Sequence, residues 1–102
     1  MPITPEDLAL AQRLWTMADR RGFSCASSDR KRARFLAGRE EHGDDLAALD
    51  LMGEALQEVD DAFIYAALEF ILRPRPGLVA VQIKCRELEA ALLACLPPER
   101  PG

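Results

Sequence analysis

Apolar residues recur at intervals of three and four along most of the chain, which is the period of an amphipathic helix. The first such segment predicts a helix over residues 5–21. Thr4 suits its N-cap, Pro5 suits its first turn and Gly22 suits its C-terminal stop. The apolar face of this helix contains Leu8, Ala11, Leu14, Trp15 and Ala18. We therefore expect Trp15 to lie in the helical core.

Two more helices are predicted in the central part of the chain. Residues 29–41 form a shorter pattern that Ser27 or Ser28 can cap, and His42 and Gly43 interrupt it. Residues 45–72 form the longest pattern, with an apolar face of Leu49, Leu56, Val59, Phe63, Ala67, Phe70 and Ile71. Gly53 lies inside this pattern at a cost of about 1 kcal/mol relative to Ala. It indicates a kink, a short turn between two helices or a close approach of helices.

The fourth predicted helix covers residues 78–96 and follows a clear break. Residues 73–77 contain two prolines and a glycine, which cannot continue a helix. After the break, a seam with alternating spacings of three and four is formed by Leu78, Val81, Cys85, Leu88, Leu92 and Cys95. This seam fits either packing inside a bundle or a two-fold dimer seam. Residues 97–102 are expected to form a flexible tail.

The fold class expected from this pattern is all-α. Aromatic residues make up 6% of the chain and no alternating run of β-branched residues occurs, whereas Ala and Leu are abundant. We expect one domain over residues 1–96, a four-helix bundle-like arrangement that forms a homodimer.

Charge and cysteine content limit the partners and the cellular compartment that we expect for the protein. A formal net charge of −4 disfavours free nucleic acid as a partner. Cys25, Cys85 and Cys95 form no pair with zinc-site spacing. No N-terminal apolar run resembles a signal peptide, and no apolar stretch is long enough to cross a membrane. These observations predict a reduced cytoplasmic protein without a membrane partner.

The charges are also segregated along the chain. Apart from Asp29, the charged residues of 20–39 are basic, whereas those from Glu40 to Asp61 are acidic. This asymmetry fits either an anion-binding face beside a cation-binding face or two solvated surfaces.

Within the acidic block, four carboxylates follow helical spacing. Asp50, Glu54, Glu58 and Asp61 are separated by steps of four, four and three, which places them in a stripe roughly 80° wide. Towards the C-terminus the same angular sector contains Tyr65, Leu68 and Leu72. We therefore expect the stripe to lie at the margin of a buried face, where a Mg²⁺ or Mn²⁺ ion or a basic partner would neutralise it.

The run from Ala55 to Leu68 contains Glu58-Val59-Asp60-Asp61 followed by an apolar stretch with a tyrosine. It resembles the second metal-binding helix of MazG-like all-α nucleotide pyrophosphatases, which is marked by E-x-x-D. The resemblance covers about 20 to 30 residues, and it implies Mg²⁺-dependent hydrolysis of nucleoside triphosphates to monophosphate and pyrophosphate. Glu58 and Asp61 would be catalytic, and Glu54, Glu58, Asp61 and Glu41 would bind the metal. The E-x-x-E of the family's preceding helix is absent here.

Two functional hypotheses remain open from the sequence. In the first, the protein is a MazG-like pyrophosphohydrolase or an inactive relative, and Arg34 and Arg39 bind the phosphates of a nucleotide. In the second, it is a small non-enzymatic helical interaction protein of the phage or mobile-element type. Its acidic face would then bind a basic protein partner.

Overall fold

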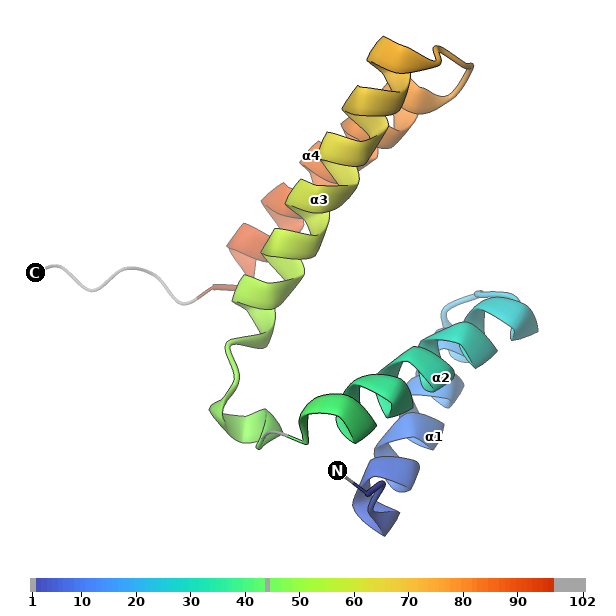
Figure 1. Ribbon diagram of the computed structural model, residues 1–102, viewed down its shortest axis with the longest axis vertical. Helices are drawn as coiled ribbons and strands as arrows, with labels where there is room; N and C mark the ends of the chain where they lie inside the picture. Colours follow the sequence, from blue (N-terminus) through green and yellow to red (C-terminus); the bar gives the residue numbers. More distant parts are fainter. Residues whose placement is uncertain (1, 44, 97–102) are drawn as a thin grey trace, which may run out of the picture. The chain divides into compact units, whose positions relative to one another are not determined.

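A computed structural model describes residues 2–43 and 45–96 and shows four α-helices (Figure 1). In chain order they are α1 (Pro5–Arg20), α2 (Cys25–His42), α3 (Leu51–Leu72) and α4 (Leu78–Ala94). A short 3₁₀ helix, η1 (Leu46–Ala48), precedes α3. No strand occurs among the described residues, so the all-α prediction is confirmed.

The chain divides into two compact units, Met1–Leu49 and Asp50–Gly102. Helices α1 and α2 pack against each other in the first unit, and α3 and α4 pack in the second. Each unit is a helical hairpin, because the connection between its two helices is short. The single domain over 1–96 and the homodimer stay predictions, and the expected tail over 97–102 lies outside the described residues.

The ends of α1 follow the sequence closely. Thr4 and Asp7 form a capping box, in which each side chain accepts a hydrogen bond of 3.1 Å from the other residue's backbone N–H. The helix ends at Arg20, one residue before the predicted end, because the Arg21 N–H already belongs to the closing turn.

Helix α2 begins four residues earlier than predicted. The Ser24 hydroxyl accepts a hydrogen bond of 3.1 Å from the Ser27 N–H and caps the helix. Ser27 and Ser28, the predicted caps, therefore lie in the first turn, where both are buried. The helix continues to His42, and Gly43 follows it in the left-handed conformation.

The interface between α1 and α2 is built from small and polar groups. Ala11 and Ala18 are its buried apolar residues. Trp15 is half-buried rather than central, and its indole N–H donates to Asp29 Oδ1 at 2.9 Å. The Arg39 guanidinium donates to Asp7 Oδ1 at 2.9 Å and links the end of α2 to the start of α1.

The long helix predicted over 45–72 is interrupted. Asp45 caps η1 through the Ala47 N–H, and α3 begins only at Leu51, where Asp50 Oδ1 accepts from the Gly53 N–H at 3.0 Å. A Cβ at position 53 would lie 2.2 Å from Asp50 Oδ2. Gly53 thus permits the cap to approach the helix, which is the physical reason for a glycine here.

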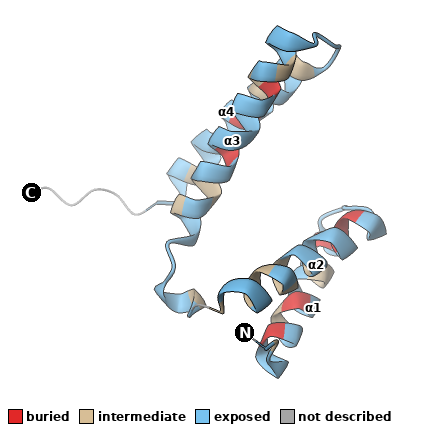
Figure 2. Ribbon diagram, in the orientation of Figure 1, coloured by how far each residue is buried: buried red, intermediate tan, exposed pale blue. Residues whose placement is uncertain are grey.

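Helices α3 and α4 share a narrow core. Val59, Ala66 and Cys85 are its buried residues, whereas most of the surface of both helices is exposed (Figure 2). In the connecting turn, Arg73 and Arg75 both bind the Glu69 carboxylate, and Gly77 adopts a left-handed conformation at the start of α4. Helix α4 ends at Ala94 rather than at residue 96, because Cys95 already closes the last turn.

Candidate functional site

The predicted metal ligands of α3 form an exposed stripe. Glu54, Glu58 and Asp61 are all exposed, and their helical positions fall within an arc of roughly 60°. None of the three carboxylates forms a hydrogen bond or ion pair within residues 2–43 and 45–96. Asp50, by contrast, uses its carboxylate to cap the helix. The stripe therefore contains three available carboxylates rather than four.

The apolar continuation of this stripe is exposed as well. Tyr65, Leu68 and Leu72 have 69%, 47% and 63% of their surface exposed. The prediction that the stripe lies at the margin of a buried face is therefore wrong within this hairpin. We call the six residues Glu54, Glu58, Asp61, Tyr65, Leu68 and Leu72 the docking stripe. It runs along α3 for about 27 Å at the helical rise of 1.5 Å per residue.

The structure does not assemble a metal centre from the predicted ligands. Among the described residues, no group of three or more His, Cys, Asp or Glu side chains lies close enough to hold a metal ion. Glu41 belongs to α2, where its Oε2 lies 3.8 Å from His42 Nε2. A Mg²⁺ site formed by Glu41, Glu54, Glu58 and Asp61 stays a prediction.

The two predicted phosphate ligands lie in different environments. Arg34 is exposed and lines a shallow depression with Arg30 and Lys31. Arg39 is mostly buried and bound to Asp7. The Thr4 backbone N–H and the Arg39 side chain lower the pKa of the Asp7 carboxyl. The two arginines are separated by about 140° around α2, so they do not form one site.

The predicted seam of α4 is divided between two environments. Leu78, Cys85 and Leu92 are buried or half-buried against α3. Val81, Leu88 and Cys95 are exposed. A single neighbouring helix covers only one side of α4, which leaves the second half of the seam without a partner in the hairpin.

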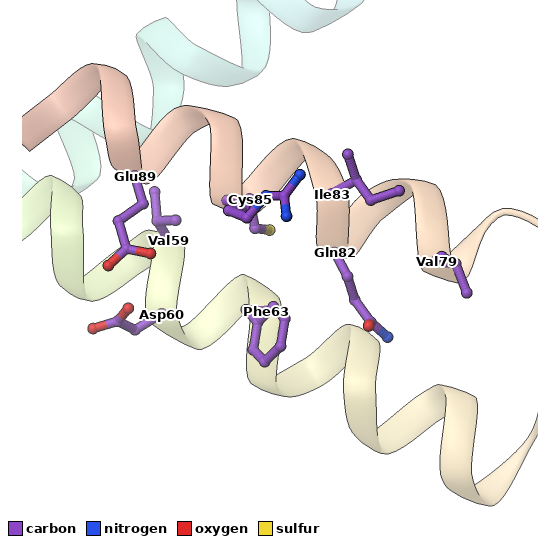
Figure 3. A pocket seen from close by; sticks show the side chains of 9 residues that line it. Val59, Asp60, Phe63, Val79, Gln82, Ile83, Cys85 and Glu89 are labelled. Carbon is purple, nitrogen blue, oxygen red and sulfur yellow. The ribbon is translucent and has the colours of Figure 1, made fainter.

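A groove that the sequence did not predict lies between α3 and α4, on the side of the hairpin away from the docking stripe (Figure 3). It encloses about 360 Å³, and its apolar lining consists of Val59, Phe63, Val79, Ile83 and Cys85, with Gln82 among them. Its charged residues are Asp60, Arg86 and Glu89. The signal in the sequence was the pair Val79 and Ile83, which have helical spacing but fall outside the seam.

The charged residues of the groove lack partners in the hairpin. Asp60, Arg86 and Glu89 form no hydrogen bond or ion pair with any part of the chain that the structure describes. In Figure 3, Asp60 and Glu89 lie at one end of the groove and Val79 lies at the other. The groove thus combines an apolar floor with an uncompensated charged end.

Comparisons with known proteins found no family model, curated protein or solved structure that matches the chain. Within the described ranges, every helix is too short or too polar to span a membrane.

Proposed function

We propose that this protein is a non-enzymatic helical interaction protein that binds a basic partner helix along the docking stripe of α3. One observation carries the proposal: the stripe is an exposed surface with unpaired carboxylates in one half and large apolar side chains in the other. Contiguous exposed apolar groups bordered by charge are typical of binding surfaces.

The chemistry of the stripe specifies its partner. Burial of Tyr65, Leu68 and Leu72 supplies a hydrophobic contribution, whereas Glu54, Glu58 and Asp61 select cationic side chains. A partner helix with Lys or Arg over about two turns and Leu or Phe over the next two would match this surface. The net charge of −4 favours a basic protein over nucleic acid. Three free cysteines among the described residues support a cytoplasmic setting.

The proposal is tested by photo-crosslinking in the cell that expresses the protein. A photoreactive amino acid at Tyr65 should capture a protein with a basic amphipathic helix. The same group at Ala80, which is exposed on α4, serves as the matched control. Glu58→Lys and Asp61→Lys should abolish capture, whereas Glu87→Lys, an exposed α4 carboxylate outside the stripe, should preserve it. Equal capture from Tyr65 and Ala80 would refute the proposal.

A MazG-like pyrophosphohydrolase is the second proposal, and the same unpaired carboxylates support it. Carboxylate oxygens are the ligands that Mg²⁺ and Mn²⁺ prefer. In this proposal Glu54, Glu58 and Asp61 hold the ion, with Glu58 and Asp61 next to the reacting phosphate.

A thermal melt with millimolar Mg²⁺ or Mn²⁺ separates the two proposals. Binding of the ion to the folded chain should raise the melting midpoint, and Glu58→Gln should remove the increase. Release of pyrophosphate from nucleoside triphosphates would then identify an active enzyme. An unchanged midpoint would contradict the metal site, and capture by the docking stripe without added metal would favour the interaction protein.

A further inference from the structure

The groove between α3 and α4 lies on a different side of the hairpin from the docking stripe. Asp60 and Phe63 are turned from the centre of the stripe by roughly 120° to 180° around α3. An occupant of the groove would therefore leave the docking stripe uncovered.

We propose that a second copy of this chain packs on the groove, so that two α3/α4 hairpins form an intermolecular four-helix bundle around a two-fold axis. Two features of this surface support the occupant: exposed apolar side chains continue from the groove along both helices, and its charges include a cation and carboxylates that can pair across a two-fold axis.

The apolar surface around the groove extends along both helices. Phe63, Val79 and Ile83 have 45%, 51% and 43% of their surface exposed although they line the groove. Ile64, Ile71 and Leu93 extend the exposed apolar surface along α3 and α4. A face of two adjacent helices along α4 measures about 25 by 20 Å, or roughly 500 Å² in projection. Side chains standing out of that face bring its accessible area towards the roughly 800 Å² per partner of a standard interface.

The charges specify a copy of the same chain rather than an arbitrary apolar helix. Along α4 the residues of the groove occur in the order Val79, Ile83, Arg86 and Glu89, and Asp60 lies with Glu89 at one end. A two-fold axis between Arg86 and Glu89 would bring the Arg86 guanidinium of each copy to the carboxylates of the other. Both ion pairs then form in a single isologous interface, in which each Arg86 faces two carboxylates and a net charge of −1 per copy remains.

The same axis also matches the apolar residues. Val79 and Ile83 lie on the side of Arg86 nearer the turn, and Leu93 lies beyond Glu89. Rotation by 180° places Val79 and Ile83 of one copy over the Leu93 end of the other. Apolar side chains therefore meet apolar side chains at both ends of the interface.

The first experiment measures the mass of the full chain by sedimentation equilibrium. A dimer has twice the chain mass of 11.3 kDa. Ile83→Glu places a carboxylate in the centre of the interface and should weaken dimerisation by roughly 30-fold or more. Val81→Glu is the matched control, because Val81 is a β-branched residue of the same helix with 44% exposure, yet it lies outside the groove. This variant should remain dimeric.

A charge exchange tests the two-fold pairing independently of folding. Arg86→Glu creates a groove with three acids, and Asp60→Lys with Glu89→Lys creates a groove with three bases. Each protein alone should be monomeric, whereas an equimolar mixture should form a one-to-one heterodimer. Circular dichroism checks that both variants keep their helices, as the exposure of all three side chains leads us to expect.

Three results would overturn the inference: a monomeric wild-type chain at all concentrations, equal effects of Ile83→Glu and Val81→Glu, or a mixture that remains monomeric. None of these results affects the docking stripe, whose test depends on capture at Tyr65. Conversely, loss of that capture leaves the dimer through the groove intact.

Discussion

The contact between Asp50 and Gly53 gives a quantitative test of how α3 begins. Asp50 Oδ1 accepts from the Gly53 N–H at 3.0 Å, and a Cβ at position 53 would lie 2.2 Å from Oδ2 and 2.8 Å from Cγ of the same side chain. Gly53→Ala therefore forces the Asp50 carboxylate to rotate away, and the cap is lost.

Two opposing contributions decide the effect of Gly53→Ala on the free energy of unfolding. Loss of an N-cap costs about 1 kcal/mol, and replacement of Gly by Ala within a helix gains up to about 1 kcal/mol. In the wild-type background the two nearly cancel. In an Asp50→Ala background no carboxylate remains to be displaced, so Gly53→Ala should stabilise the protein by about 1 kcal/mol. The coupling between the two positions is therefore expected to be about 1 kcal/mol.

Urea denaturation followed by far-ultraviolet circular dichroism measures this coupling. Wild type, both single variants and the double variant are compared at one protein concentration, because self-association would shift the unfolding midpoint. A stabilisation of about 1 kcal/mol by Gly53→Ala in both backgrounds would refute the close approach, since the coupling would then be zero.

Three further predictions concern buried and paired polar groups. Ser28 is fully buried, and its hydroxyl has no hydrogen-bond partner among the residues that the structure describes, so Ser28→Ala should stabilise the protein by about 1 kcal/mol in urea denaturation. Ser27→Ala should not, because the Ser27 hydroxyl accepts a hydrogen bond from Lys31. The pKa of Asp7 is lowered in the folded state by the Thr4 N–H and Arg39, so its stabilising contribution is complete above the unfolded value of about 3.9 and is lost as the pH falls through the folded value. Urea midpoints measured from pH 6 to pH 2 should show this loss, and Asp7→Asn should reduce it. Arg73 and Arg75 lower the pKa of Glu69 to about 2. An NMR titration of the Glu69 carboxyl group should show this pKa in wild type and a return towards 4.5 in Arg73→Ala. A pKa near 4.5 in wild type would contradict the pairing.

The sequence predicted the helices better than their contacts. The helical period identified all four segments, and Thr4, Pro5 and the prolines of residues 73–77 marked ends that the structure confirms. The start of α2 was missed, because Ser24, Ser27 and Ser28 are chemically equivalent as caps. Only the three-dimensional path of the chain decides which hydroxyl meets the free N–H groups.

The candidate site was predicted in part. The stripe of Glu54, Glu58 and Asp61 follows from the helical period alone and is present in α3. The different role of Asp50 depends on where α3 begins, which the period does not specify. The groove required the relative rotation of α3 and α4, and no spacing within one helix encodes it.

The three cysteines give the α3/α4 hairpin a built-in probe of its own opening. Cys85 is buried between the two helices, whereas Cys25 and Cys95 are exposed. A thiol reagent should therefore modify Cys25 and Cys95 rapidly, and Cys85, of which 9% is exposed along the groove, far more slowly unless the helices separate. The slow phase of the reaction would report how often the hairpin opens, and the two fast thiols would calibrate the reagent in the same molecule. The kinetics of this core are thus measurable in the unaltered chain, without a fluorophore or an engineered cysteine.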